Sequence, residues 1–208
     1  TFSSRGEYRV NRNVSLFYSA RALDAKFDFD DGFGPPPDFL IGDSLAHGSI
    51  EQLAGRVGAQ VDLLDGRFKN TFAVQGMDLR RESVAAWPGW FEGDRIKGEY
   101  KGVLEVNQWI SLLAGADWER TGATTSGFVG RETAELWGTY AQLSAEPIDG
   151  LVVTAGGRFD EHDAFGDFTT YRLTAAYLIP GTDTKLRASK GTGFRAPTLS
   201  ELYAPGSG

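Results

Sequence analysis

Five aspartates lie at the end of an alternating segment and in the loop that follows it: Asp28, Asp30, Asp31, Asp38 and Asp43. The loop, DDGFGPPPDFLIGDS, is rich in Gly and Pro, and three consecutive prolines exclude a central strand. Hard cations such as Ca²⁺ need several carboxylate and carbonyl oxygens on a chain that can wrap around them. The spacing is not that of an EF-hand, so the pattern allows either a calcium site or a solvated acidic loop.

A second group of chemically capable residues is Asp160-Glu161-His162-Asp163, which could suggest metal binding or acid–base chemistry. Strand alternation would place neighbouring side chains on opposite faces, so the four cannot converge. His47 and His162 are the only histidines, and no Ser/His/Asp set or carboxylate pair stands out. We therefore predict no catalytic residues and a protein that is not an enzyme.

Charged residues also recur in the middle of alternating segments, always on the polar side. The set is Arg56, Asp62, Lys101, Glu105, Asp117, Arg158, Arg172 and Arg187. A wide barrel with a hydrated interior tolerates both signs of charge on its inner face. A soluble sandwich would turn the same residues to its outside, so this set fits either architecture.

The elements that must carry these residues are strands. In the segment 151–160, Leu151, Val153 and Ala155 alternate with polar or small residues, and the segments 170–177 and 185–189 repeat the pattern. Period-two alternation is typical of strands with one apolar and one polar face. Several aromatic residues fall on apolar faces near strand ends, as in an interfacial girdle or a soluble core: Tyr100, Trp118, Phe159, Tyr171 and Tyr177.

The first half of the chain is less regular. Residues 1–11 predict no element. Leu16, Tyr18 and Ala20 lie on one parity and Leu23, Ala25 and Phe27 on the other, which predicts a bulge or turn near Arg21. Asp65-Gly66 predicts a tight hairpin turn.

Connection lengths are expected to alternate between short turns and long loops. The turns are near 64–66, 107–109, 146–150 and 179–183, and the loops cover 30–49, 83–94 and 121–130. Short turns at one end and longer loops at the other are typical of outer-membrane barrels. Trp87, Trp90 and Phe91 fall in the second loop, where we expect them to pack against neighbouring loops.

Composition narrows the classes further. The chain has 208 residues with 27 Gly, no Cys and a formal net charge of -7, which argues against a disulfide framework and against nucleic-acid binding. No apolar run approaches about 18 residues, so no transmembrane helix is expected. We predict an all-β protein of antiparallel up-and-down hairpins with about ten strands.

One stretch carries a family resemblance: AGGRFDEHDAFGDFTTYRLTAAYLIPGTDTKLRASKGTGFRAPTLSELYAP, residues 155–205. It resembles the barrel of TonB-dependent outer-membrane receptors, most closely the cobalamin (vitamin B12) transporter branch. The family pattern is matched at Arg158-Phe159-Asp160, at Thr170-Tyr171, from Gly191 through Leu199, and at Leu202-Tyr203. A looser similarity reaches back to about Val103.

The resemblance implies a partial outer-membrane barrel as a single domain over 1–208, with the plug domain and the C-terminal barrel strands absent. It implies energy-coupled uptake of a cobalamin-like or siderophore-like metal chelate across the outer membrane of a Gram-negative bacterium. The implied partners are outer-membrane lipid, a TonB-type coupling protein acting through the plug, and the small chelate. Calcium, the one cofactor expected, would bind some of Asp28, Asp30, Asp31 and Asp43.

An alternative function class remains: a soluble, secreted β-sandwich that binds glycans or another surface partner. An open piece of barrel has two unpaired edges, which lipid does not tolerate. Such a piece would close into a smaller barrel, pair with a second copy, or pack its apolar faces on each other.

Overall fold

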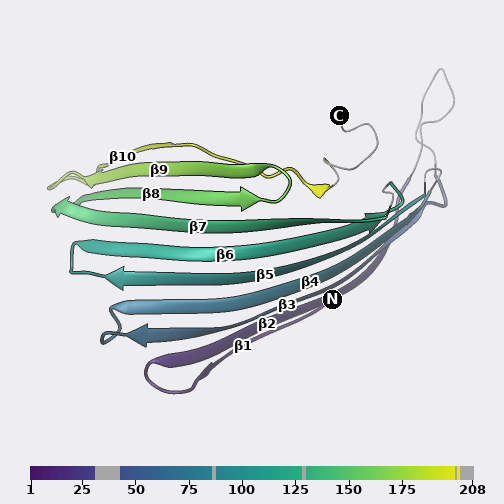
Figure 1. Ribbon diagram of the computed structural model, residues 1–208, viewed down its shortest axis with the longest axis horizontal. Coiled ribbons are helices and arrows are strands. Elements are labelled where there is room, and N and C mark those ends of the chain that lie inside the picture. Colours follow the sequence, from purple (N-terminus) through teal and green to yellow (C-terminus); the bar gives the residue numbers. More distant parts are fainter. Residues whose placement is uncertain (31–42, 86–87, 128–129, 200, 202–208) are drawn as a thin grey trace.

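The computed structural model describes residues 1–30, 43–85, 88–127, 130–199 and 201. These residues form a single antiparallel sheet of ten strands in which each strand pairs with its neighbours in sequence (Figure 1). The strands are β1 (Phe2–Arg9), β2 (Val14–Asp28), β3 (His47–Leu63), β4 (Phe68–Val84), β5 (Gly89–Glu105), β6 (Ile110–Thr125), β7 (Arg131–Ile148), β8 (Leu151–His162), β9 (Gly166–Leu178) and β10 (Lys185–Gly191). The all-β, up-and-down prediction is confirmed.

The sheet is one curved layer and is open (Figure 1). Strands β1 and β10 stand at its two edges, and each is paired on one side only. The sandwich alternative is therefore wrong, because a sandwich needs a second sheet to cover the first. Residues 1–11, which predicted no element, include β1.

The short connections follow their predicted turn chemistry. Leu64, Asp65 and Gly66 have positive φ angles of 53°, 55° and 86°, as a tight hairpin requires. Asn107 accepts hydrogen bonds from the backbone N–H groups of Trp109 and Ile110. These connections, with those at 149–150 and 179–184, lie at one end of the sheet, which we call the turn end.

The opposite end, called the loop end, differs from the prediction. The expected loops at 83–94 and 121–130 are wrong, since β4 and β5 leave only 85–88 between them and β6 and β7 leave only 126–130. Trp90 and Phe91 lie within β5, whereas Trp87 lies outside the described residues. The first loop is shorter than predicted, because β3 begins at His47 rather than after Ser49.

The predicted bulge near Arg21 is also wrong. Strand β2 pairs with β3 without interruption, from Val14 opposite Val61 to Asp28 opposite His47. The apolar residues of β2 therefore move from one face of the sheet to the other because the environment of each face changes along the strand. The backbone itself continues without a bulge.

The sheet has almost no core of its own. Among the described residues, the buried apolar side chains are four alanines, Ala46, Ala73, Ala123 and Ala134. Large apolar side chains are instead exposed, including Val57 at 60% and Trp137 at 57%. Burial of apolar surface drives folding, so these side chains need a cover that the sheet does not supply.

Candidate functional site

The two faces of the sheet are defined here by one residue each. Directly opposite residues in neighbouring strands share a face, so the register assigns every strand residue. The Arg158 face carries all eight of the predicted charges, from Arg56 to Arg187. The Trp118 face carries all five predicted aromatics. Both sequence predictions of a shared face are confirmed.

Arg158 is the centre of an ion-pair network on its face. Its Nε donates to Asp160 at 2.8 and 2.9 Å, and its two terminal nitrogens donate to the Asp117 carboxylate at 2.8 and 3.1 Å. Both aspartates are nearly buried, at 6–7% exposure. The guanidinium crosses Gly138 to reach them, and a Cβ on Gly138 would lie 1.9 Å from Arg158 Nη2. Glycine is therefore required at this close approach.

The network continues along the sheet toward β3. Lys97 Nζ lies 3.5 Å from Asp117 and 3.7 Å from Glu119. Arg95 donates two hydrogen bonds to Glu119, at 2.7 and 2.6 Å. Arg56 forms an ion pair with Glu99. The centre of the Arg158 face, from β3 to β8, is thus a chain of compensated charges.

Cations nevertheless outnumber acids on the Arg158 face, although the whole chain is acidic. The cations are Arg5, Arg9, Arg21, Arg56, Lys69, Arg81, Arg95, Lys97, Lys101, Arg158, Arg172, Lys185 and Arg187. The strand acids on this face are Glu7, Asp62, Glu99, Glu105, Asp117, Glu119, Glu132 and Asp160. The excess of acids lies on the other face and in the connections.

The Trp118 face is apolar from the turn end up to a sharp boundary. On β5 the apolar band runs from Leu104 to Ile96, close to the length of about 9–11 residues that a tilted strand needs to cross the hydrocarbon of a bilayer. Trp118 and Trp137 lie at its upper edge, with ring centroids 6.0 Å apart. Trp118 Nε1–H donates to Glu135 at 3.4 Å. The ring therefore lies at the edge of the apolar band, while its N–H group contacts a charged side chain.

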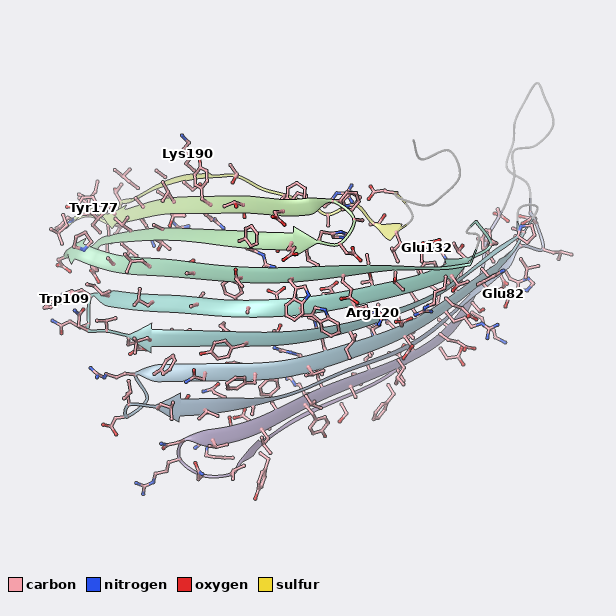
Figure 2. The ribbon with its side chains drawn as sticks, viewed as in Figure 1. Glu82, Trp109, Arg120, Glu132, Tyr177 and Lys190 are labelled. Carbon is pink, nitrogen blue, oxygen red and sulfur yellow. The ribbon has the colours of Figure 1, made fainter. Side chains whose placement is uncertain are left out.

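Above the two tryptophans both faces change character. The Trp118 face becomes a charged rim of Asp24, Glu51, Asp78, Arg80, Glu92, Asp94, Arg120, Arg131 and Glu135. The Arg158 face becomes mainly apolar, with Leu23, Phe27, Met77, Leu79, Phe91, Ala123, Ala134 and Leu136, although Arg81 and Glu132 also lie there. Figure 2 shows Glu82 and Glu132 toward the loop end, opposite Trp109 and Tyr177 at the turn end.

Asn70 is a buried polar residue within the apolar band, and its side chain is hydrogen-bonded. Asn70 is 5% exposed, accepts a hydrogen bond from the Tyr100 hydroxyl at 2.9 Å, and donates to the Val61 and Phe68 carbonyl groups. A buried amide without these partners would cost stability. With these hydrogen bonds made, the Asn70 side chain can be buried among apolar neighbours.

The segment after β10 folds back over the apolar part of the Arg158 face. Phe194 stacks on Phe168 with ring centroids 3.7 Å apart. Pro197 and Leu199, with Met77 and Phe91, then line a cavity of about 400 Å³ against β4–β8. The family-like sequence motif thus contributes an inward turn at the loop end.

That turn is closed by a capping box. The Glu201 N–H donates to the Thr198 hydroxyl at 3.2 Å, and the Glu201 carboxylate accepts from the Thr198 N–H at 2.8 Å. Arg195 donates two more hydrogen bonds to this carboxylate, at 3.0 and 2.6 Å. The Arg195 guanidinium, followed by the two Thr198 donors, lowers the pKa of Glu201 to about 2. This capping box was not predicted from the sequence, although the pattern Thr-x-x-Glu at residues 198–201 indicates one.

Three of the four predicted calcium ligands, Asp28, Asp30 and Asp43, lie within the described residues. Asp28 lies at the end of β2 on the Trp118 face, and Asp30 accepts a hydrogen bond from the Ser44 N–H at 3.3 Å. Asp43 is described, whereas Asp31 and Asp38 lie outside the described residues. Within the described part of the chain, no three His, Cys, Asp or Glu side chains form a group that could hold a metal ion. The calcium site stays a prediction.

The Asp160–Asp163 cluster behaves as alternation predicted. Asp160 and His162 lie on the Arg158 face, and Glu161 lies on the other. Asp160 pairs with Arg158, and His162 Nδ1 accepts from the Ala164 N–H at 3.1 Å.

No helix among the described residues is long and apolar enough to cross a membrane.

Comparison with known proteins decides the family. The family model for the TonB dependent receptor-like β-barrel matches residues 1–208. The chain belongs to this family. Its members are transporters rather than enzymes, and the chain is a protein of the Gram-negative outer membrane.

Named relatives and structures agree with this placement. The chain is 27% identical over 190 residues to the vitamin B12 transporter BtuB of Photobacterium profundum, covering 89% of this chain and 29% of the transporter. It is 29% identical over 152 residues to that of Vibrio vulnificus, covering 67% and 24%. The chain therefore spans less than a third of the length of these relatives.

Among solved structures, the siderophore receptor PirA from Pseudomonas aeruginosa superposes with a TM-score of 0.71 at 17% identity, covering 95% of this chain and 35% of that one. A ferric enterobactin receptor (PfeA) mutant from the same species gives 0.73 at 14%, covering 96% and 33%. These likenesses establish the fold. In a barrel of this family, the Trp118 face meets lipid and the Arg158 face lines the interior.

Replacing Arg158 by Met should destabilise the folded barrel by about 3 kcal/mol, because two nearly buried aspartates lose the guanidinium that pairs with both, and Asp117 keeps only Lys97 among the described residues. Chemical denaturation of the receptor containing this chain, followed by tryptophan fluorescence in lipid vesicles, measures the change. Arg172→Met is the matched control, because Arg172 is exposed on the same face, and it should cost under about 0.5 kcal/mol. Equal losses in both variants would contradict the prediction.

The Glu201 carboxylate should stay ionised well below its ordinary pKa of 4.5 and protonate only near pH 2. A lowered pKa means that the contact stabilises the turn above pH 4.5 and is lost as the pH falls toward 2. Infrared carboxylate titration, taken as the difference from Glu201→Gln, measures this pKa. Arg195→Gln should raise it toward 4.5, and protonation near 4.5 in the unaltered protein would refute the assignment.

Calcium binding by the first loop is tested by isothermal titration of the folded receptor. If Asp28, Asp30, Asp31 and Asp43 supply ligands, Asp30→Asn with Asp43→Asn should abolish the heat of calcium binding, because carboxylate charge is lost. Asp65→Asn, in the turn at the other end, serves as the control. No heat with millimolar calcium in the unaltered receptor would remove the site.

Proposed function

We propose that this chain forms part of the barrel of a receptor that takes up a cobalamin-like or siderophore-like metal chelate across the outer membrane. The observation that carries the proposal is the pairing of a lipid-length apolar band on one face with a charged, water-compatible face on the other. A wide barrel that encloses a hydrated path needs both. The vitamin B12 transporters and siderophore receptors that resemble the chain support the chelate class.

The roles of the described residues follow from their places in the sheet. The apolar band and its tryptophans hold the wall at a fixed depth in the bilayer. The Arg158 network keeps the inner wall rigid without leaving a buried charge alone. Energy for release would come from a TonB-type coupling protein that acts through a plug inside the barrel.

The proposal is tested by deleting the gene that encodes the receptor and measuring uptake of labelled cyanocobalamin and of ferric siderophores. We expect uptake of at least one chelate to fall to background and to return with the intact gene. Loss of the coupling protein should reproduce the defect, because transport against a gradient needs energy. Unchanged uptake of every chelate in the deletion strain would refute the function.

A further inference from the structure

His162 ends strand β8 on the Arg158 face, where its side chain is nearly buried. Its Nδ1 accepts a hydrogen bond from the Ala164 N–H at 3.1 Å. The same Nδ1 lies 3.1 Å from Oδ1 of Asp163. A neutral ring accepts through a bare nitrogen, whereas a charged ring carries a proton on both nitrogens and can only donate. The two contacts of this one atom therefore belong to opposite charge states of His162.

Asp163 is held beside the ring by the neighbouring strand β7. Its Oδ2 accepts from the Glu135 N–H at 3.0 Å, and its own N–H donates to the Glu135 carbonyl group at 3.2 Å. Protonation of His162 would give Nδ1 a charge-assisted hydrogen bond to this carboxylate and would leave the Ala164 N–H without its acceptor. The connection between β8 and β9 therefore has two hydrogen-bonding arrangements, and the charge of His162 selects between them.

This connection shares a cavity with the segment after β10, residues 192–199, which we call the returning segment. His162, Pro197 and Leu199 all line the cavity of about 400 Å³. The His162 ring also packs against Phe165, with ring centroids 4.7 Å apart. A neutral imidazole suits this apolar wall, whereas a nearly buried charge beside Pro197 and Leu199 costs free energy. Protonation therefore disfavours the covered cavity as well as the present turn.

The other charged groups around the cavity already have partners of opposite sign. Those that line it form three ion pairs: Asp94–Arg131, Arg95–Glu119 and Glu135–Arg120. At the end of the returning segment, Arg195 binds Glu201 and keeps the pKa of that carboxyl at about 2. In the part of the chain that the structure describes, none of these groups forms an ion pair with His162.

The acids close to His162 on β8 and β9 are also directed elsewhere. Asp160 pairs with Arg158. Two further acids lie on the opposite face of the sheet: Glu161 and Asp167. Asp163 is the acid that contacts the ring, so its carboxylate and the Ala164 N–H are the two groups that respond to the charge of His162.

We propose that the connection between β8 and β9 is a pH-sensitive latch. It holds the returning segment over its cavity while His162 is neutral and releases the segment when His162 is protonated. Histidine is the side chain that ordinarily changes charge between about pH 5 and pH 8. Because the covered arrangement holds the neutral ring, it is stable above this range and is lost as the pH falls through it. The inference goes beyond the proposed uptake function and does not depend on which chelate is carried.

The test follows a nitroxide spin label on the returning segment of the folded receptor in lipid vesicles. Gly193→Cys carries the label, because a Cβ at Gly193 meets no atom within 4 Å and this chain has no cysteine of its own. The rest of the receptor is kept free of reactive cysteine. We expect the mobile fraction of the label to rise at least about twofold between about pH 8 and pH 5. His162→Gln, which cannot take up a proton, should abolish the rise.

His47→Gln is the matched control, because it removes the other histidine of this chain, which is exposed at the start of β3. It should leave the transition unchanged. Asp163→Asn keeps an acceptor for the Glu135 N–H but removes the charge that favours a protonated ring, so the midpoint should move to a lower pH. Heat-modifiable electrophoretic mobility checks folding, and Asp163→Asn gives a second reading if His162→Gln does not fold.

Three results with the label would overturn the inference: mobility that does not change across this pH range, a transition that persists in His162→Gln, and a transition that disappears in His47→Gln. A midpoint that stays in place in Asp163→Asn would also overturn it, because the carboxylate would then not respond to the ring. These results leave the proposed function intact. Unchanged uptake in the deletion strain would refute that function and leave the latch standing.

Discussion

The sheet depends on an apolar environment for its exposed side chains that its own residues do not supply. Its backbone hydrogen bonds are made between sequential strands, but its large apolar side chains stand exposed and its buried apolar residues are alanines. In water this arrangement would gain little from the hydrophobic effect. In a bilayer the same side chains lie in hydrocarbon, and the antiparallel ladder satisfies the backbone as lipid demands. The membrane is thus the missing half of the core.

The thickness of the hydrocarbon layer explains why the apolar residues change from one face of the sheet to the other at Trp118 and Trp137. Below the two rings, the outward side must be apolar and the inward side may be charged. Above them the outward side meets water and headgroups, so Asp24, Asp78 and Glu135 are tolerated there. The strands run on past this boundary as one sheet, and their inward side then carries Met77 and Phe91, which line a cavity together with the returning segment.

Much of this could be predicted from alternation alone. The strands, the tight turns and the shared face of Arg56, Asp117 and Arg158 were all accessible, because side-chain period reports the face directly. The bulge predicted near Arg21 was wrong because alternation also reports the environment, and the environment reversed while the backbone continued. The loops predicted at 83–94 and 121–130 were wrong for the same reason, since the strand segments above Trp118 carry apolar residues such as Phe91 and Ala123 on the opposite face.

Other features had weaker signals. The first strand holds Phe2, Gly6 and Tyr8 on one face and Ser3 and Arg5 on the other, but a short polar segment rarely predicts a strand without its partner. The calcium prediction rested on the acidic composition of the loop and on the family resemblance, and it stays untested because Asp31, one of its four expected ligands, lies outside the described residues.

The distribution of charge along the Arg158 face follows a physical logic of its own. Where Asp117 and Asp160 are nearly buried, each must have a partner, because an isolated charge there would be costly. The sheet therefore places Arg158 between them and removes the side chain at Gly138 to let it pass. Arg5 and Arg21 are exposed to the interior, so water can solvate them and no partner is imposed. Compensation is thus strict where the wall is dry and relaxed where it is wet.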